Sequence, residues 1–147
     1  MSSLVNLSEG SSLAFHGLAI VAIRHPERVT VKYLANVLNA SEAHMAKIFQ
    51  RLNKAGYVKS LRGPSGGFVL TCESDDLSLL DIYEAIEGKI TMQACPLGKE
   101  KCRFSRCIFG DRLAEISKDI YDMLKSIKLS AFFDNIKICK ESTYENN

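Results

Sequence analysis

The chain lacks any apolar run of the roughly 18–20 residues that a helix needs to cross a bilayer. Its first ten residues, MSSLVNLSEG, also lack the basic segment and the following apolar segment of a secretory signal. Both absences argue against insertion in a membrane and against export. We therefore expect a cytoplasmic protein that makes no membrane contact.

Motifs typical of enzymes are missing as well. The sequence has no flavin or nicotinamide fingerprint, no C-x-x-C pair, and no constellation of Ser, His and Asp for nucleophilic catalysis. The glycine-rich stretch from 62 to 67 departs from the GxxxxGKS/T spacing of a phosphate-binding loop, and no helical pattern follows it at once. We therefore expect that the protein is not an enzyme.

Positive charge is concentrated in one part of a nearly neutral chain. The 147 residues carry a net charge of +2, and 46% of them are hydrophobic, which is enough for a core. Between residues 24 and 62, eight basic residues oppose two acidic ones, so this stretch carries +6 and the remainder −4. Contact with DNA phosphates requires such a local positive field, although an ordinary solvated basic face has the same composition.

Hydrophobic periodicity predicts two helices in the first forty residues. The first covers 10–24, with Ser8 near its N-cap, and it ends at His25-Pro26 because proline disfavours helical geometry in the residue before it. The second has about eight or nine residues and follows Thr30.

A third helix is predicted over 41–56, with Ser41 as its N-cap and Gly56 as its stop. Two helices joined by a tight turn, the second of them short and basic, form a helix-turn-helix pattern. The outward face of the third helix is predicted to present Ala43, His44, Lys47, Arg51 and Lys54.

The next segment predicts a β-hairpin. Two short strands, at 57–61 and 67–70, flank the turn Arg62-Gly63-Pro64-Ser65-Gly66. Glycine and proline at this density mark a turn, so we interpret the segment as a wing. Arg62 at the base of the wing can enter a DNA minor groove, where narrow A·T-rich segments attract guanidinium groups.

The second half of the chain predicts a helix over 78–87, ended by Gly88, and a longer amphipathic helix over 108–130. Since the long helix has little core to cover, we expect its apolar stripe to bind a second copy of the chain. The fold class is therefore mainly α with a small β-hairpin: a winged helix-turn-helix plus a long C-terminal dimerisation helix. The expected units are a DNA-binding domain over 1–88, a cysteine-containing loop over 89–110, and a dimerisation helix with its tail over 111–147.

Three of the five cysteines lie in one short stretch, ACPLGKEKCRFSRCIFG. Grouped thiols in a cytosolic protein more often bind a metal or undergo redox chemistry than form disulfides, and an odd count fits a disulfide framework poorly. Thiolates are soft ligands that suit both iron–sulfur clusters and zinc. The stretch predicts a metal centre on Cys95, Cys102 and Cys107, whereas Cys72 and Cys139 are interpreted as inert thiols.

The order of these features, together with the runs AGYV, VKSLRGPSGGFVL and LLDIYEAIEG, resembles the IscR/NsrR family of winged-helix transcription regulators (Rrf-two type). The resemblance extends from about residue 7 to about residue 130. It implies a homodimer that binds double-stranded DNA at a palindromic promoter site. It also implies an iron–sulfur cluster on the three cysteines that senses iron–sulfur status, nitric oxide or redox state.

The resemblance also bears on the fourth cluster ligand. The cysteine spacing is C-x6-C-x4-C, whereas IscR-like proteins more often have x5 and x5. The ligand histidine of IscR-like proteins corresponds to Gly110 here, and the ligand aspartate of NsrR-like proteins corresponds to Ser12. We therefore expect His16, one helical turn after Ser12, to complete the site across the dimer, with Glu9 as a weaker candidate. The alternative for His16 is an ordinary core residue.

Positions that match the family's DNA contacts lie on the third helix and in the wing. IscR-like proteins have a base-selecting glutamate where this chain has Ala46, so the resemblance implies DNA binding without implying the same promoter sequence. With Arg51 added from the polar face of the helix, the expected contacts are Ser41, Ala43, His44, Lys47, Arg51, Arg62, Pro64, Ser65 and Gly66.

The identity of the cofactor stays open between several forms. Histidine ligation favours a two-iron (2Fe-2S) cluster over a four-iron (4Fe-4S) cluster. Three thiolates and one histidine would also satisfy tetrahedral zinc. A regulator of the same fold without any metal would instead respond to a small molecule or a partner protein.

Overall fold

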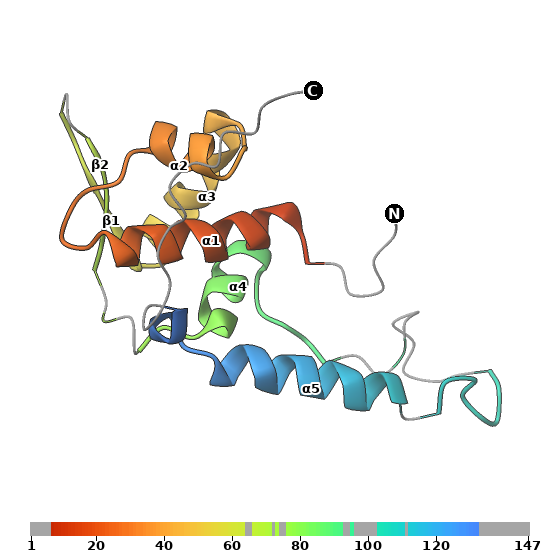
Figure 1. Ribbon diagram of the computed structural model, residues 1–147. Helices are drawn as coiled ribbons and strands as arrows, with labels where there is room; N and C mark the ends of the chain where they lie inside the picture. The colour runs from red at the N-terminus through yellow and green to blue at the C-terminus, as the bar shows by residue number, and fades with distance from the viewer. Residues whose placement is uncertain are drawn as a thin grey trace, which may run out of the picture.

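The computed structural model describes residues 7–63, 66–71, 73, 76–92, 95, 103–110 and 112–132. Within these ranges the chain forms five α-helices, a two-stranded antiparallel hairpin and a short 3-10 helix (Figure 1), so the predicted fold class is confirmed. No helix in the described ranges is long and apolar enough to span a membrane. The elements are α1 (Glu9–Ile23), α2 (Val31–Val37), α3 (Glu42–Lys54), β1 (Val58–Leu61), β2 (Gly67–Leu70), α4 (Leu79–Glu87), α5 (Arg112–Ser126) and η1 (Leu129–Phe132).

A hydroxyl side chain caps each of the first four helices. In each case the side-chain oxygen accepts a hydrogen bond from the backbone N–H three residues later, and the capping residues are Ser8, Thr30, Ser41 and Ser78. One such cap typically stabilises a helix by about 1 kcal/mol. At α4 the cap is reciprocal, because the Asp81 carboxylate also accepts from the Ser78 backbone N–H at 2.9 Å.

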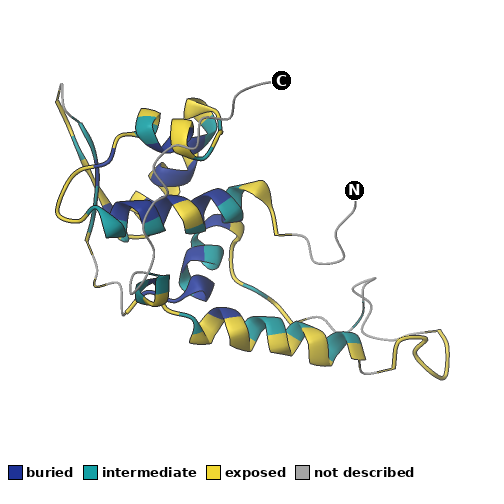
Figure 2. Cartoon of the chain, viewed as in Figure 1, coloured by how far each residue is buried: buried dark blue, intermediate teal, exposed yellow. Residues whose placement is uncertain are grey.

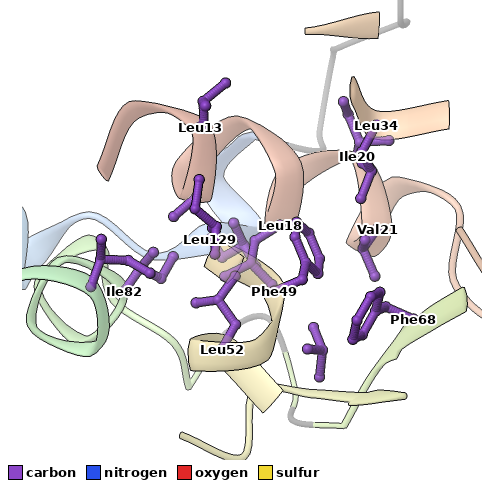
Figure 3. Close-up of a cluster of buried hydrophobic side chains, with 14 of the residues drawn as sticks. Leu13, Leu18, Ile20, Val21, Leu34, Phe49, Leu52, Phe68, Ile82 and Leu129 are labelled. Atoms are coloured by element: carbon purple, nitrogen blue, oxygen red, sulfur yellow. The ribbon is translucent and has the colours of Figure 1, made fainter. Parts of the chain in front are cut away.

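Helix α1 passes through the middle of the domain, and its apolar residues form the centre of the core (Figures 1 and 3). Leu18 of α1 and Phe49 of α3 are fully buried. Gly17 allows the two helices to approach closely, since a Cβ atom at that position would lie 2.8 Å from the Phe49 ring. On its other side Phe49 packs against Phe68 of β2, with the ring centroids 5.0 Å apart. Helix α3 is thus held between α1 and the hairpin.

The hairpin is attached to the loop between α1 and α2. Its strands pair in antiparallel register, with Ser60 opposite Phe68. The Val29 N–H donates to the Phe68 carbonyl at 2.9 Å, and the Phe68 N–H donates to the Val29 carbonyl at 2.8 Å. Gly67 makes this approach possible, because a Cβ atom there would lie 2.7 Å from the Val29 oxygen. The base of the wing is therefore fixed to the body of the domain.

The C-terminal helix is shorter than predicted. The sequence predicts a helix over 108–130, whereas α5 covers Arg112–Ser126. Residues 108–110 form a turn in which Gly110 has a φ of 58°. At the other end, the Leu129 N–H donates to the Leu77 carbonyl at 2.8 Å, and the Leu129 side chain is fully buried. The helix ends early because Leu129 packs into the core and its backbone pairs with the segment before α4.

Helix α5 packs on α4 with one side and leaves the remainder of its surface uncovered (Figure 2). Leu124 is the one residue of α5 that is buried. The side chains of Ile116 and Met123, in contrast, are 46% and 48% exposed. Large apolar side chains left exposed on one helix are typical of a surface that contacts another chain.

Candidate nucleic-acid interface and metal centre

Helix α3 has an apolar face and a polar face. Its inward side consists of four residues that are at most 3% exposed: Met45, Ile48, Phe49 and Leu52. The residues predicted to contact DNA lie on the other side, where Ser41, Ala43 and Lys47 are exposed and His44 is half-buried. Burial of the apolar stripe therefore turns these polar groups and the basic end of α3 toward solvent.

The turn between α2 and α3 is tight. Asn39 adopts a left-handed conformation with a φ of 49°, which asparagine tolerates better than most residues. The next residue, Ala40, donates its N–H to the Ala35 carbonyl at 2.9 Å, and Ser41 then begins α3. Since α2 also packs against α3, the pair has the helix-turn-helix arrangement predicted from the sequence.

The predicted wing contacts that the structure describes lie at the turn end of the hairpin, so Arg62 is not at the base of the hairpin, where the sequence predicts it. Arg62 is exposed at the end of β1, and Gly66 is half-buried. The Gly66 N–H donates to the Gly63 carbonyl at 2.9 Å, and Gly63 has a φ of 115°, which a side chain would disfavour. Pro64 and Ser65 lie outside the described residues.

Arg51, predicted as a DNA contact, has a partner inside the domain. Its Nη1 donates to the carbonyl of Ile86, in the last turn of α4, at 2.7 Å. The last carbonyls of a helix lack partners within the helix, and a cation near them is favoured by the helix dipole. Arg51 therefore links α3 to the C-terminal end of α4. Contact between Arg51 and DNA stays a prediction.

Glu87, the last residue of α4, joins that helix to the start of α1. The Ser8 and Ser11 hydroxyls both donate to its Oε1, the latter at 2.8 Å. These two hydrogen bonds, together with the nearby charge of Arg51, hold the pKa of the Glu87 carboxyl below its ordinary value, although partial burial opposes the shift. No local pattern in the sequence indicates this link, because Ser11 and Glu87 are 76 positions apart.

The predicted cysteine ligands are only partly described. Cys95 is half-buried, Cys107 is exposed, and Cys102 lies outside the described residues, as do Cys72 and Cys139. Residues 103–110 are exposed and project beyond the N-terminal end of α5 (Figures 1 and 2). Among the residues that the structure covers, no three His, Cys, Asp or Glu side chains gather closely enough to hold a metal ion.

His16 is on the surface of α1 and is not a core residue. Its Nδ1 lies 2.6 Å from the Ser12 carbonyl, and a carbonyl can only accept, so Nδ1 carries the proton. In neutral imidazole this leaves the lone pair on Nε2. Histidines that bind metals usually donate through the other ring nitrogen to a carbonyl or carboxylate in this way. The donor set of three thiols and this imidazole nitrogen therefore suits a cluster or zinc chemically. Glu9, the weaker candidate, is also exposed.

Exposed apolar side chains continue from α5 into the preceding loop. The side chains of Phe104 and Ile108 are 73% and 82% exposed, and that of Phe109 is 48% exposed. Phe104, Ile108 and Phe109 thus lie close to Cys107 in the chain, and Ile116 and Met123 continue the exposed apolar side chains along α5.

A helix-turn-helix followed by a wing, with a basic outward face on the second helix, defines a winged helix-turn-helix DNA-binding regulator. Solved structures share this fold. CymR of B. subtilis, described as a global cysteine regulator, matches with a TM-score of 0.70 and 23% identity over 91% of this chain and 100% of that one. IscR of T. potens matches with a TM-score of 0.68 and 25% identity over 86% of this chain and 85% of that one.

Sequence relatives agree with this class. IscR of Yersinia pseudotuberculosis, an HTH-type transcriptional regulator, is 29% identical over 73% of this chain and 65% of IscR. YffB of Lactococcus lactis, a candidate HTH-type transcriptional regulator, is 31% identical over 88% of each chain. The Rrf2 family model, described as an iron-dependent transcriptional regulator, matches residues 7–135. The chain therefore belongs to the Rrf2 family of DNA-binding transcription regulators and is not an enzyme, as the sequence predicts.

Proposed function

We propose that the protein is a homodimeric transcription regulator whose affinity for a palindromic promoter depends on an iron–sulfur cluster. The cluster ligands are Cys95, Cys102 and Cys107, with His16 of the partner subunit as the fourth. The chief support is the thiol-bearing loop placed directly before α5, in a family described as iron-dependent.

The proposed units are those predicted from the sequence: residues 1–88 bind DNA, 89–110 hold the cluster, and 111–147 form the dimer. Exposed Ile116 and Met123 on α5 supply an apolar surface for the second copy. The proposed DNA contacts are Ser41, Ala43, His44 and Lys47 on α3, with Arg62, Pro64, Ser65 and Gly66 in the wing.

The cluster would supply a centre whose charge and integrity change with redox state, nitric oxide or iron supply. The neutral Nε2 of His16 beside three thiolates favours the two-iron form. Since the cysteine loop leads directly into α5, a rearranged loop would change the angle between the two subunits and hence the spacing of the two α3 helices. By linkage, DNA must in turn change the stability of the cluster by the same free energy.

The test is anaerobic purification followed by the absorption spectrum and the content of iron and acid-labile sulfide per chain. We expect a coloured protein with matched iron and sulfide. His16→Ala should alter the spectrum and lower the cluster content, whereas the control His25→Ala, at another exposed histidine, should leave both unchanged. An unaltered spectrum in His16→Ala would remove His16 from the ligand set.

A regulator of the same fold without iron is the second candidate. This alternative is favoured because neither fourth ligand usual in the family is present: Ser12 stands in place of the aspartate and Gly110 in place of the histidine. A colourless protein after attempted reconstitution, with one zinc per chain or no metal, would establish this alternative and leave the DNA-binding function intact.

A further inference from the structure

A groove of about 560 Å³ separates α3 from the wing. Its floor is apolar and consists of Val31, Ala46 and Phe68. Its rim is polar and consists of Gln50, Asn53, Lys59, Ser60 and Arg62. We propose that this groove binds one sugar–phosphate unit of the DNA backbone, with Asn53 and Lys59 as its phosphate contacts. The proposal rests on the DNA-binding function and adds a site to it.

Asn53 is oriented to donate. The Ser60 backbone N–H donates to the Asn53 Oδ1 at 3.2 Å, which fixes which end of the side-chain amide faces the wing. The Nδ2 group, with two N–H donors, is then the end available at the rim of the groove. A phosphate oxygen accepts strong, charge-assisted hydrogen bonds from such a donor. The Asn53 side chain therefore accepts a hydrogen bond from the wing backbone through Oδ1 and can donate one to a phosphate through Nδ2.

The charge of the groove also selects a phosphate. Lys59 and Arg62 are exposed, and none of the described residues that line the groove carries a carboxylate. A second groove, of about 460 Å³ between α3 and α4, offers a contrast because its basic residues Arg51 and Lys54 are balanced by two glutamates. Of these two grooves, the one beside the wing combines positive charge with polar donors and an apolar floor that suits the C–H groups of deoxyribose.

The position of the groove matches the geometry of a duplex. A recognition helix in the major groove and a wing in the adjacent minor groove must straddle the backbone strand that separates them. The space between α3 and the hairpin is where that strand has to pass. Phosphate contacts of this kind set the register of a protein on DNA without reading its sequence.

The test uses the full chain and a fluorescein-labelled, mixed-sequence duplex of about 30 base pairs, with anisotropy measured from about 50 to about 300 mM salt. The variants are Lys59→Gln and Asn53→Asp, of which the latter keeps an acceptor for the Ser60 N–H. The control is Lys125→Gln, which changes the net charge by the same amount at an exposed position of α5, on the opposite side of the helix from Ile116 and Met123 and so away from the proposed dimer surface.

We expect both groove variants to bind about tenfold more weakly at low salt, as expected for loss of a charge-assisted contact. Lys59→Gln should also reduce the slope of log K against log salt by about 0.9 per subunit. The Lys125→Gln control should bind like the wild type. If Asn53→Asp fails to fold, Lys59→Gln decides alone, since its side chain is exposed on β1. Groove variants that match the control at every salt concentration would overturn the site, and a wild type that binds no duplex would overturn the DNA-binding function itself.

Discussion

The close approach of α1 and α3 predicts that Gly17→Ala destabilises the protein, although alanine is normally the better helix former. The added Cβ would lie 2.8 Å from Cε2 and 3.1 Å from Cζ of Phe49, a ring that is fully buried. Overpacking of this kind costs about 1–3 kcal/mol, and the helix propensity of alanine offsets about 1 kcal/mol of it. We expect a net loss of about 1 kcal/mol and a fall in Tm of about 4 °C.

A matched control is available in the same helix. A Cβ atom at Gly10 would meet its nearest neighbour, the Ile86 side chain, at an ordinary 3.5 Å. Gly10→Ala should therefore be neutral or more stable than the wild type by up to about 1 kcal/mol. Thermal and urea denaturation followed by circular dichroism measure both variants. A Gly17→Ala protein as stable as Gly10→Ala would refute the argument that glycine sets the spacing of α1 and α3.

Three further predictions concern the wing and the end of α4. Gly67→Ala should weaken DNA binding several-fold, because its Cβ would lie 2.7 Å from the Val29 carbonyl oxygen and would displace the hairpin. Titration of a labelled duplex measures the affinity, and an unchanged affinity would contradict the prediction. Since the folded pKa of Glu87 lies below its ordinary value of 4.5, its contribution to stability is present at neutral pH and is lost as the pH falls from that value through the lowered one. The free energy of unfolding of Glu87→Gln should therefore fall less than that of the wild type as the solution becomes acidic. Urea denaturation at a series of values from about pH 3 to about pH 7 measures the difference. Arg51→Gln should lower Tm, because it removes the hydrogen bond to the Ile86 carbonyl, and should leave the salt slope of DNA binding unchanged. A slope reduced by about one would instead support the predicted contact between Arg51 and DNA.

Local signals account for the parts of the fold that the sequence predicts. The N-caps at Ser8 and Ser41 and the glycine that follows α3 act on their immediate neighbours, so their effects can be inferred from a few residues. The hairpin is equally local, because its turn and both strands lie within fifteen residues of Tyr57. The basic face of α3 follows from helical periodicity alone.

Tertiary contacts account for what the sequence does not reveal. The apolar pattern of the C-terminal helix continues to Leu129, but pairing with Leu77 ends the helix earlier, and no local residue indicates that partner. The pairing of Val29 with Phe68 is likewise a contact between distant segments. The candidate metal centre is harder still to predict from the sequence. Its proposed fourth ligand, His16, would come from a second chain, and it stands at neither of the positions where relatives have their ligand histidine or aspartate.

The hydrogen bonds of Glu87 and Arg51 connect three helices of the chain at one place. The last turn of α4 is bonded to the first turn of α1 through Glu87 and to α3 through Arg51. The chain leaves α4 at Gly88 and continues toward Cys95, while His16 lies two turns into α1. In the proposed dimer, the cysteine segment of one subunit and the His16-bearing α1 of its partner would therefore each join this end of α4 in their own subunit, and α3 is bonded there as well. A rearrangement of the cysteine loop that displaced the end of α4 would therefore act on α1 through the Glu87 carboxylate and on α3 through the Arg51 guanidinium.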